Sequence, residues 1–159
     1  MKLYIKQKVF SFRDRFTVYD ELGNDRFYVQ GEVFTFGKKL HIYDLNGFEV
    51  AFVHEKALTF LPKYYINING IDIAEVVKQF TFFKQSYVVN GLNWKVSSNF
   101  WAMDYHIDSP NGIIANINKK MWSFGDTYEI DIANSADTVT ALAVVLIIDA
   151  CLEQQNNYN

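Results

Sequence analysis

The sequence contains little cysteine and little proline, with one cysteine and two prolines among 159 residues. The single cysteine, Cys151, excludes an intramolecular disulfide. The first eight residues include three lysines and lack the apolar core of a secretory signal. We therefore expect a cytoplasmic protein.

An excess of charge of one sign is also lacking, because 15 Lys and Arg residues oppose 18 Asp and Glu residues, for a net charge of −3. Residues 1–39 are mildly basic, with eight Lys or Arg against five Asp or Glu, whereas no Lys or Arg follows Lys120. A nucleic-acid-binding domain usually has a clustered basic face and a high pI. We therefore expect no nucleic-acid partner, and most charges are interpreted as solvated surface groups.

The sequence shows no metal or catalytic motif. His41, His54 and His106 lack the i, i+4 or Cys/His spacing of a ligand set, so neither a metal nor another cofactor is expected. Gly125-Asp126-Thr127 suits a hairpin connection, and no general base lies at an informative spacing from it. The interpretation is that the protein is not an enzyme.

The longest apolar run lies near the end of the chain, where Ala141 to Ile148 are eight consecutive apolar residues. Such a run covers every face of a helix and predicts a helix surrounded by protein. Polar residues from Asn134 onward supply a start signal, so the helix is expected over about 137–153, followed by a short polar tail, 154–159. Eight residues are far fewer than the roughly 18 to 20 that cross a bilayer, so no transmembrane segment is expected.

The rest of the chain is rich in aromatic residues, with 14 Phe, 10 Tyr and 3 Trp, a composition that favours strands. From Leu3 to Ile132, short alternating segments are separated by turn signals about every 8–12 positions, which is typical of an all-β sandwich or barrel. With the helix, these segments predict a mainly β fold: a closed antiparallel β-barrel around a central hydrophobic C-terminal helix, in one domain over 1–153. The phenylalanines assigned to strands include Phe34, Phe36, Phe80, Phe82 and Phe83.

An internal repeat supports the barrel. The segment from Val53 to Ile68 matches the segment from Ile117 to Ile132 at a constant offset of 64 residues. Each repeat is a hairpin that cannot bury its apolar face alone, which favours a ring of hairpins. The matched residues are Val53, Lys56, Phe60, Tyr64, Ile66 and Ile68 in the first copy, with Ala74, Lys78, Phe82 and Tyr87 in a weaker further copy.

Four stretches of the sequence carry a family resemblance: 5–11, 28–31, 36–40 and above all 117–130, from Ile117-Asn118-Lys119-Lys120 to Tyr128-Glu129-Ile130. They resemble the LURP-one-related proteins, which belong with the tubby C-terminal domain and the phospholipid scramblases. The resemblance implies a roughly twelve-stranded antiparallel barrel around a central C-terminal helix. The tubby branch binds phosphoinositide head groups and the scramblase branch acts at membranes, whereas this sequence has no palmitoylated cysteine cluster and no terminal membrane helix.

Basic residues at strand ends are the candidate binding site. The lysine pairs Lys38/Lys39 and Lys119/Lys120 are expected on two turns, with Arg13 and Arg15 as further candidates. Lysines suit phosphate as mobile point charges, and arginine offers a planar fork. We therefore expect a soluble binding or scaffold module that recognises anionic lipid head groups or a phosphorylated partner, at the periphery of a membrane.

The sequence is also compatible with three other interpretations of its lysines, its barrel mouth and its aromatic residues. Paired lysines at strand ends also occur as solvated, edge-protecting residues. A pocket at the barrel mouth would make the protein a small-molecule binder or an unrecognised enzyme, and Asp149, beside the apolar run, must then reach the mouth or find a partner. Exposed aromatics such as Trp94 and Trp101 would favour self-association, and the oligomeric state is left open.

Overall fold

The structure, a computed structural model, describes residues 1–6, 15–99, 104–122 and 125–157, with backbone alone for 120–122 and 125–126. Within this part of the chain lie twelve strands, a 3₁₀ turn and one α-helix. The strands are β1 Lys2–Lys6, β2 Arg15–Asp20, β3 Asp25–Gly31, β4 Lys39–Tyr43, β5 Glu49–Glu55, β6 Lys63–Ile68, β7 Ile71–Lys78, β8 Ser86–Asn90, β9 Trp94–Ser98, β10 Asp104–Ser109, β11 Gly112–Trp122 and β12 Gly125–Ile132. The 3₁₀ turn is η1 Ser135–Asp137, and the helix is α1 Thr138–Asn157.

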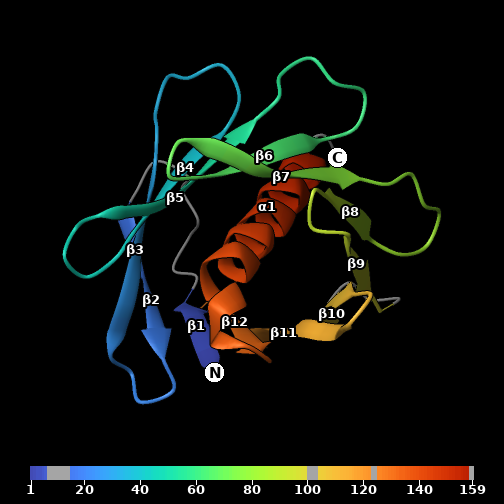
Figure 1. Ribbon diagram of the computed structural model, residues 1–159. Helices are drawn as coiled ribbons and strands as arrows, with labels where there is room; N and C mark the ends of the chain where they lie inside the picture. The colour runs from blue at the N-terminus through green and yellow to red at the C-terminus, as the bar shows by residue number, and fades with distance from the viewer. Residues whose placement is uncertain (7–14, 100–103, 123–124, 158–159) are drawn as a thin grey trace.

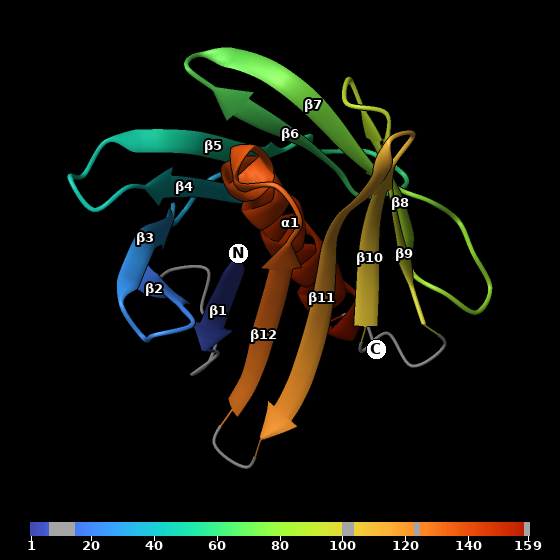
Figure 2. The same ribbon diagram turned by 60° about the horizontal axis from the view of Figure 1, so that its bottom comes forward.

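The strands form a closed antiparallel barrel, as predicted (Figure 2). Each strand pairs with its neighbours along the chain, and β1 pairs with β12 to close the ring, with Lys2 opposite Asp131 and Lys6 opposite Thr127. Closure leaves no strand edge unpaired, which removes the usual route to edge-to-edge aggregation.

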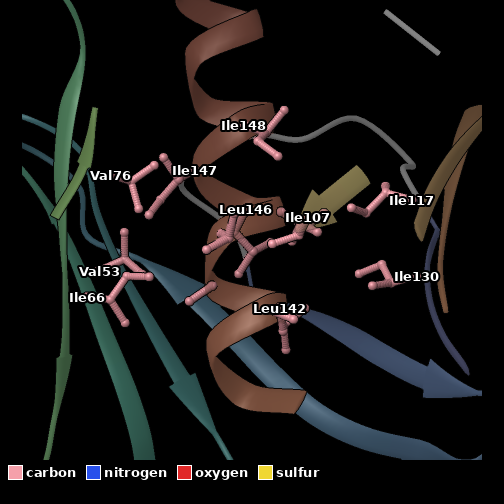
Figure 3. Close-up of a cluster of buried hydrophobic side chains, with 14 of the residues drawn as sticks. Val53, Ile66, Val76, Ile107, Ile117, Ile130, Leu142, Leu146, Ile147 and Ile148 are labelled. Carbon is pink, nitrogen blue, oxygen red and sulfur yellow. The ribbon is translucent and has the colours of Figure 1, made fainter. Parts of the chain in front are cut away.

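The helix α1 fills the barrel (Figure 1). Alternate residues of every strand face it, so that Val53, Ile66 and Val76 pack on one side of the helix and Ile107, Ile117 and Ile130 on another (Figure 3). By length and composition the segment Ser135–Asn157 could cross a membrane, but the barrel wall covers its apolar side chains in this structure. The continuous apolar run is therefore explained by burial on all sides.

Both ends of the helix are fixed by polar contacts. The Asn134 side chain accepts a hydrogen bond from the Ala136 backbone and caps η1, which confirms the start signal. The described part of the helix runs to Asn157 and so includes residues 154–157, which were expected to follow the helix as a polar tail. These residues stay helical because Gln154 and Gln155 bind the barrel wall, Gln154 Nε2 donating to Glu55 Oε1 at 2.8 Å.

Two strand assignments were wrong. Phe34 and Phe36 lie in the loop 32–38, where Phe34 has a φ of 60° that is incompatible with a pleated strand. The chain also leaves the sheet after Lys78, and the Gln79 N–H donates to the Ser86 carbonyl across the base of the loop 79–85. The phenylalanines in that loop are Phe80, Phe82 and Phe83.

The aromatic residues proposed for self-association do not form an exposed pair. Trp94 is the first residue of β9, faces the barrel interior and is only 6% exposed, so the prediction of an exposed Trp94 was wrong. Trp101, like Phe10 and Phe12, lies outside the described residues.

Candidate binding site at the C-terminal mouth

One end of the barrel surrounds the last turns of the helix, and we call it the C-terminal mouth. In an antiparallel ring, successive loops alternate between the two ends, which places the loops 32–38, 56–62 and 79–85 together at this mouth. Figure 1 shows these loops, after β3, β5 and β7, on the side of the barrel where the chain ends. The Lys78 ammonium confirms the placement by donating to Gln155 Oε1 at 3.0 Å.

Lys38 binds the helix end rather than solvent. Its ammonium donates to the Ala150 carbonyl at 3.3 Å and forms an ion pair with Glu153. Both contacts lie on the C-terminal turns of α1, so Lys38 ties the loop before β4 to this part of the helix. This predicted binding residue therefore has a structural function.

A cleft of about 550 Å³ opens at the C-terminal mouth, between the loop 56–62 and the end of α1. Its charged residues are Glu55, Lys56 and Lys78. Both Glu55 oxygens already accept hydrogen bonds, one from the Lys38 backbone N–H at 2.8 Å and one from Gln154. The Glu55 oxygens are thus occupied, and the two lysine ammonium groups outnumber this one carboxylate among the charged groups that line the cleft. The residues lining this mouth cleft are Glu55, Lys56, Leu58, Thr59, Phe60, Pro62, Lys78, Cys151, Gln154 and Gln155.

A smaller hollow of about 340 Å³ lies on the other side of Glu55 and is lined in part by Lys38 and Lys39. Lys39 forms an ion pair with Glu32 at 3.3 Å. By contrast, no lysine or arginine is found among the described residues that line a hollow at the opposite end of the barrel. Among the described residues, lysines thus line the two hollows at the C-terminal mouth but not the hollow at the opposite end.

The described side chains among the remaining predicted site residues, Arg15 and Lys119, each lie over an aromatic ring. The Arg15 guanidinium lies over the Tyr28 ring, 4.3 Å from its centroid. Lys119 lies 5.4 Å from the centroid of the buried Tyr128 ring, on the inward-facing side of β11 that also carries Ile117. Arg13 and the side chain of Lys120 lie outside the described residues, and the binding role of all six remains a prediction.

Asp149 finds a partner inside the barrel instead of reaching the mouth. It is 5% exposed, and the Tyr128 hydroxyl donates to its Oδ1 at 2.7 Å. Burial raises the pKa of Asp149, an effect opposed by that hydrogen bond and by the charges of Lys119 and Lys38. Asp149 thus belongs to a buried polar group and does not line the mouth cleft.

A layer of buried tyrosines surrounds the end of the helix near Cys151. Tyr64, Tyr87 and Tyr105 are fully buried. The hydroxyls of Tyr64 and Tyr105 have no hydrogen-bond partner among the described residues, whereas the Tyr87 hydroxyl interacts with the Cys151 thiol. Burial raises the pKa of the Cys151 thiol to about 12, so the thiol is protonated at neutral pH and a poor nucleophile. The repeat produces part of this layer, because Tyr64 and the equivalent Tyr128 both face inward.

The histidines act as hydrogen-bonding groups on the outer wall. His41 lies between two carboxylates, with Nε2 2.8 Å from Glu32 and Nδ1 2.5 Å from Glu49. Partial burial lowers the pKa of His41, but the hydrogen bonds to Glu49 and Glu32 outweigh it and raise the pKa overall. His54 and His106 contact Asp72 and Asn116, and the described residues hold no cluster of three metal-ligating side chains.

Two lysines that line the mouth cleft, and a third exposed beside it, were not among the site residues predicted from the sequence. Lys56 and Lys78 line the cleft, and Lys84 is exposed on the loop 79–85. The segments 32–39, 55–63 and 78–85 together hold six lysines and two glutamates, in a chain whose net charge is −3. The signal was present, because Lys56 and Lys78 occupy the lysine position of the repeat.

Comparison with known proteins agrees with this architecture. A sequence model of the LURP-one-related proteins matches residues 1–149. The chain belongs to the LURP-one-related family. This LURP-one-related chain is 33% identical over 152 residues to uncharacterized protein YxjI of Bacillus subtilis (strain 168), covering 96% of the chain and 94% of YxjI. An Arabidopsis thaliana protein solved by X-ray crystallography shares the fold with a TM-score of 0.62 at 17% identity, covering 94% of this chain and 90% of that one.

Proposed function

We propose that this protein is a non-catalytic binding module whose C-terminal mouth takes a phosphate-bearing group, with an anionic lipid head group as its source. The concentration of lysine around a polar cleft carries this proposal. Lys56 and Lys78 line the cleft, and neither forms an ion pair with a described residue within 4.0 Å. A phosphate in the cleft would replace the weak contacts of these ammonium groups with charge-assisted hydrogen bonds.

The structure also supports a binding function over catalysis. The one thiol at the cleft, Cys151, is 1% exposed and protonated at neutral pH. His41 and His54 lie on the outer wall, and both contact carboxylates there. The protein would then act at the periphery of a membrane in the cytoplasm, by holding a ligand rather than converting it.

The test is a titration of the protein with a soluble inositol trisphosphate, with inorganic phosphate alongside, at low and physiological salt. Binding should weaken with salt because surface charges are screened. Changing Lys56→Gln and Lys78→Gln together should weaken binding roughly tenfold or more, because each removes a charge-assisted contact. The matched control changes Arg26→Gln and Lys95→Gln, two exposed basic residues nearer the opposite end of the barrel, and should leave binding unchanged.

The outcomes separate the candidate ligands. Absence of binding to either soluble phosphate, or binding that is indifferent to the Lys56/Lys78 change, contradicts the proposal. If a phosphoserine peptide binds where the inositol phosphate does not, the ligand is a phosphorylated protein partner.

A neutral small molecule is the second candidate, because the cleft extends to the buried Cys151. Its binding would be insensitive to salt and to both pairs of substitutions. A screen of uncharged compounds against thermal stability would detect it, since a ligand that binds only the folded state raises the melting temperature.

A further inference from the structure

Seven large apolar side chains stand in solvent on the loops of the C-terminal mouth. Their exposed fractions range from 69% to 100%. Several large apolar side chains exposed at one end of a folded protein are more than the scattered single exposures that need no explanation, and they mark a candidate interaction site. We call the loops 32–38, 56–62 and 79–85 the phenylalanine loops. The exposed residues are Phe34, Phe36, Leu58, Phe60, Phe80, Phe82 and Phe83.

The backbone holds these side chains outward. Phe34 and Leu58 each occupy the third position of their loop, and each has a φ of 60°, in the left-handed region that costs a residue with a Cβ. The Thr35 hydroxyl donates to the Gly37 carbonyl at 2.8 Å and stabilises the first loop. Two loops therefore share the same unfavourable conformation at an exposed apolar residue, which is typical of a strained functional segment.

We infer that the phenylalanine loops insert into the interfacial layer of an anionic lipid bilayer while the lysines at their bases contact lipid phosphates. This inference rests on the proposed function, because the same mouth lysines meet the head groups. It adds the partner surface and the residues that enter it.

The charge of the phenylalanine loops favours an anionic bilayer over a second copy of the chain as the partner of this surface. Each phenylalanine loop carries apolar residues near its tip and lysines at its base: Lys38 and Lys39, then Lys56 and Lys63, then Lys78 and Lys84. Lys38, Lys39 and Lys63 form ion pairs with Glu153, Glu32 and Glu75. Lys56, Lys78 and Lys84 form no ion pair with a described residue and supply the positive charge that remains. Lysine stems can lie along apolar surface while the ammonium stays among head groups, and an anionic leaflet attracts such residues. Two copies of the mouth facing each other would bring these lysines together and repel.

Apolar tips surrounded by basic residues are the arrangement of interfacial membrane-binding segments. Three separate loops would enter the head-group region as three points of contact, which fixes the barrel axis relative to the membrane plane. The mouth cleft, between the loop 56–62 and the end of α1, would then open directly onto the head groups. A small ligand in solution needs only the cleft, whereas docking on a bilayer needs the loops as well.

The experiment measures flotation with vesicles of phosphatidylcholine alone and of phosphatidylcholine mixed with phosphatidylglycerol. The test variants are Phe34→Ser/Phe36→Ser, Leu58→Ser/Phe60→Ser and Phe80→Ser/Phe82→Ser/Phe83→Ser. All change exposed loop residues, so their folding should be intact, and each should reduce affinity for the mixed vesicles roughly tenfold or more. The control Leu22→Ser/Phe48→Ser changes two apolar residues of comparable exposure on loops of the opposite end and should bind like the wild type.

Insertion is measured directly with Phe60→Trp and lipids brominated in the acyl chain, which should quench the added tryptophan when mixed vesicles are present. The soluble inositol trisphosphate titration is repeated on the Phe34→Ser/Phe36→Ser and Phe80→Ser/Phe82→Ser/Phe83→Ser variants, whose residues do not line the mouth cleft, and should be unchanged since the lysines remain. Wild-type protein that binds the soluble phosphate but no vesicle overturns the insertion and leaves the proposed function standing. Vesicle binding that every serine variant retains also overturns it, and failure of both assays contradicts both ideas.

Discussion

At the scale of single residues, Asp149 is a buried carboxyl group whose protonation depends on the fold. Its folded-state pKa is raised above the ordinary value of 3.8 by burial. A group with a raised folded pKa contributes stability that is present below the unfolded pKa and is lost as pH rises through the folded pKa. We expect Asp149→Asn, which cannot ionise, to gain free energy of unfolding relative to wild type as pH rises from about 3.8.

Urea unfolding at several pH values checks this prediction. Asp72→Asn serves as a control of opposite sign, because hydrogen bonds from Asn67 and then His54 lower the pKa of Asp72. Its carboxylate contributes stability above the unfolded pKa, so this variant should lose stability relative to wild type over the same pH rise. Equal pH dependence for the two variants would show that Asp149 is not a buried carboxyl.

Two buried tyrosines should respond differently to the same Tyr→Phe substitution in their effect on the free energy of unfolding. The Tyr64 hydroxyl has no partner among the described residues, so Tyr64→Phe removes an unsatisfied group and should alter the free energy of unfolding by less than about 0.5 kcal/mol or raise it. Tyr128→Phe removes the donor to Asp149 and should cost about 1–3 kcal/mol. Chemical denaturation measures both, and a large loss at Tyr64 would reveal a hydrogen-bond partner such as a bound water.

At the scale of elements, the helix α1 supplies the core, and its two parts contribute differently. Burying each large side chain of the apolar run is worth about 1.5–3 kcal/mol, which in sum rivals the roughly 5–15 kcal/mol stability of a domain. A chain that stops at Asn134 is therefore expected not to fold. A chain that stops at Leu152 keeps the core but loses the Lys38–Glu153 pair and the two glutamine contacts.

We expect the Leu152 truncation to fold with a loss of about 1–2 kcal/mol, because the ion pair is partly exposed and therefore screened. Circular dichroism and thermal melting distinguish the two truncations. Cooperative melting of the chain ending at Asn134 would contradict the central role of the helix.

Sequence patterning predicted the barrel and its helix because both depend on which residues are apolar. Alternation in the strands and the 64-residue repeat predicted the barrel, and the uninterrupted apolar run predicted the helix inside it. The direction of individual side chains was harder to predict. A shift of one residue turns a strand side chain from one face to the other, so Lys119 could not be assigned to the interior from its position near a turn. Phe34 was assigned to a strand because aromatic residues favour strands, and its exposure on a loop was not predicted.

At the scale of the whole molecule, the two ends of the barrel differ, and the first strand closes the barrel by pairing with the last strand. The Met1 ammonium donates to the Ile132 carbonyl at 2.9 Å, across 131 positions of sequence. Contacts of such long range form late because loop closure costs entropy before the contacts stabilise it. Folding should accordingly take milliseconds to seconds, as measured by stopped-flow fluorescence.

Removing the first strand should therefore disable the molecule as a whole. Deletion of residues 1–6 removes two fully buried side chains, Leu3 and Ile5, and exposes the facing edges of β2 and β12. Such edges pair with other chains, so we expect soluble aggregates in size-exclusion chromatography with light scattering. The control Lys2→Ala keeps the strand and loses only the exposed ion pair with Glu129, and it should remain like the wild type. A monomeric deletion variant with cooperative melting would mean that the barrel is stable without closure, and that its helix rather than its ring of hydrogen bonds holds the fold together.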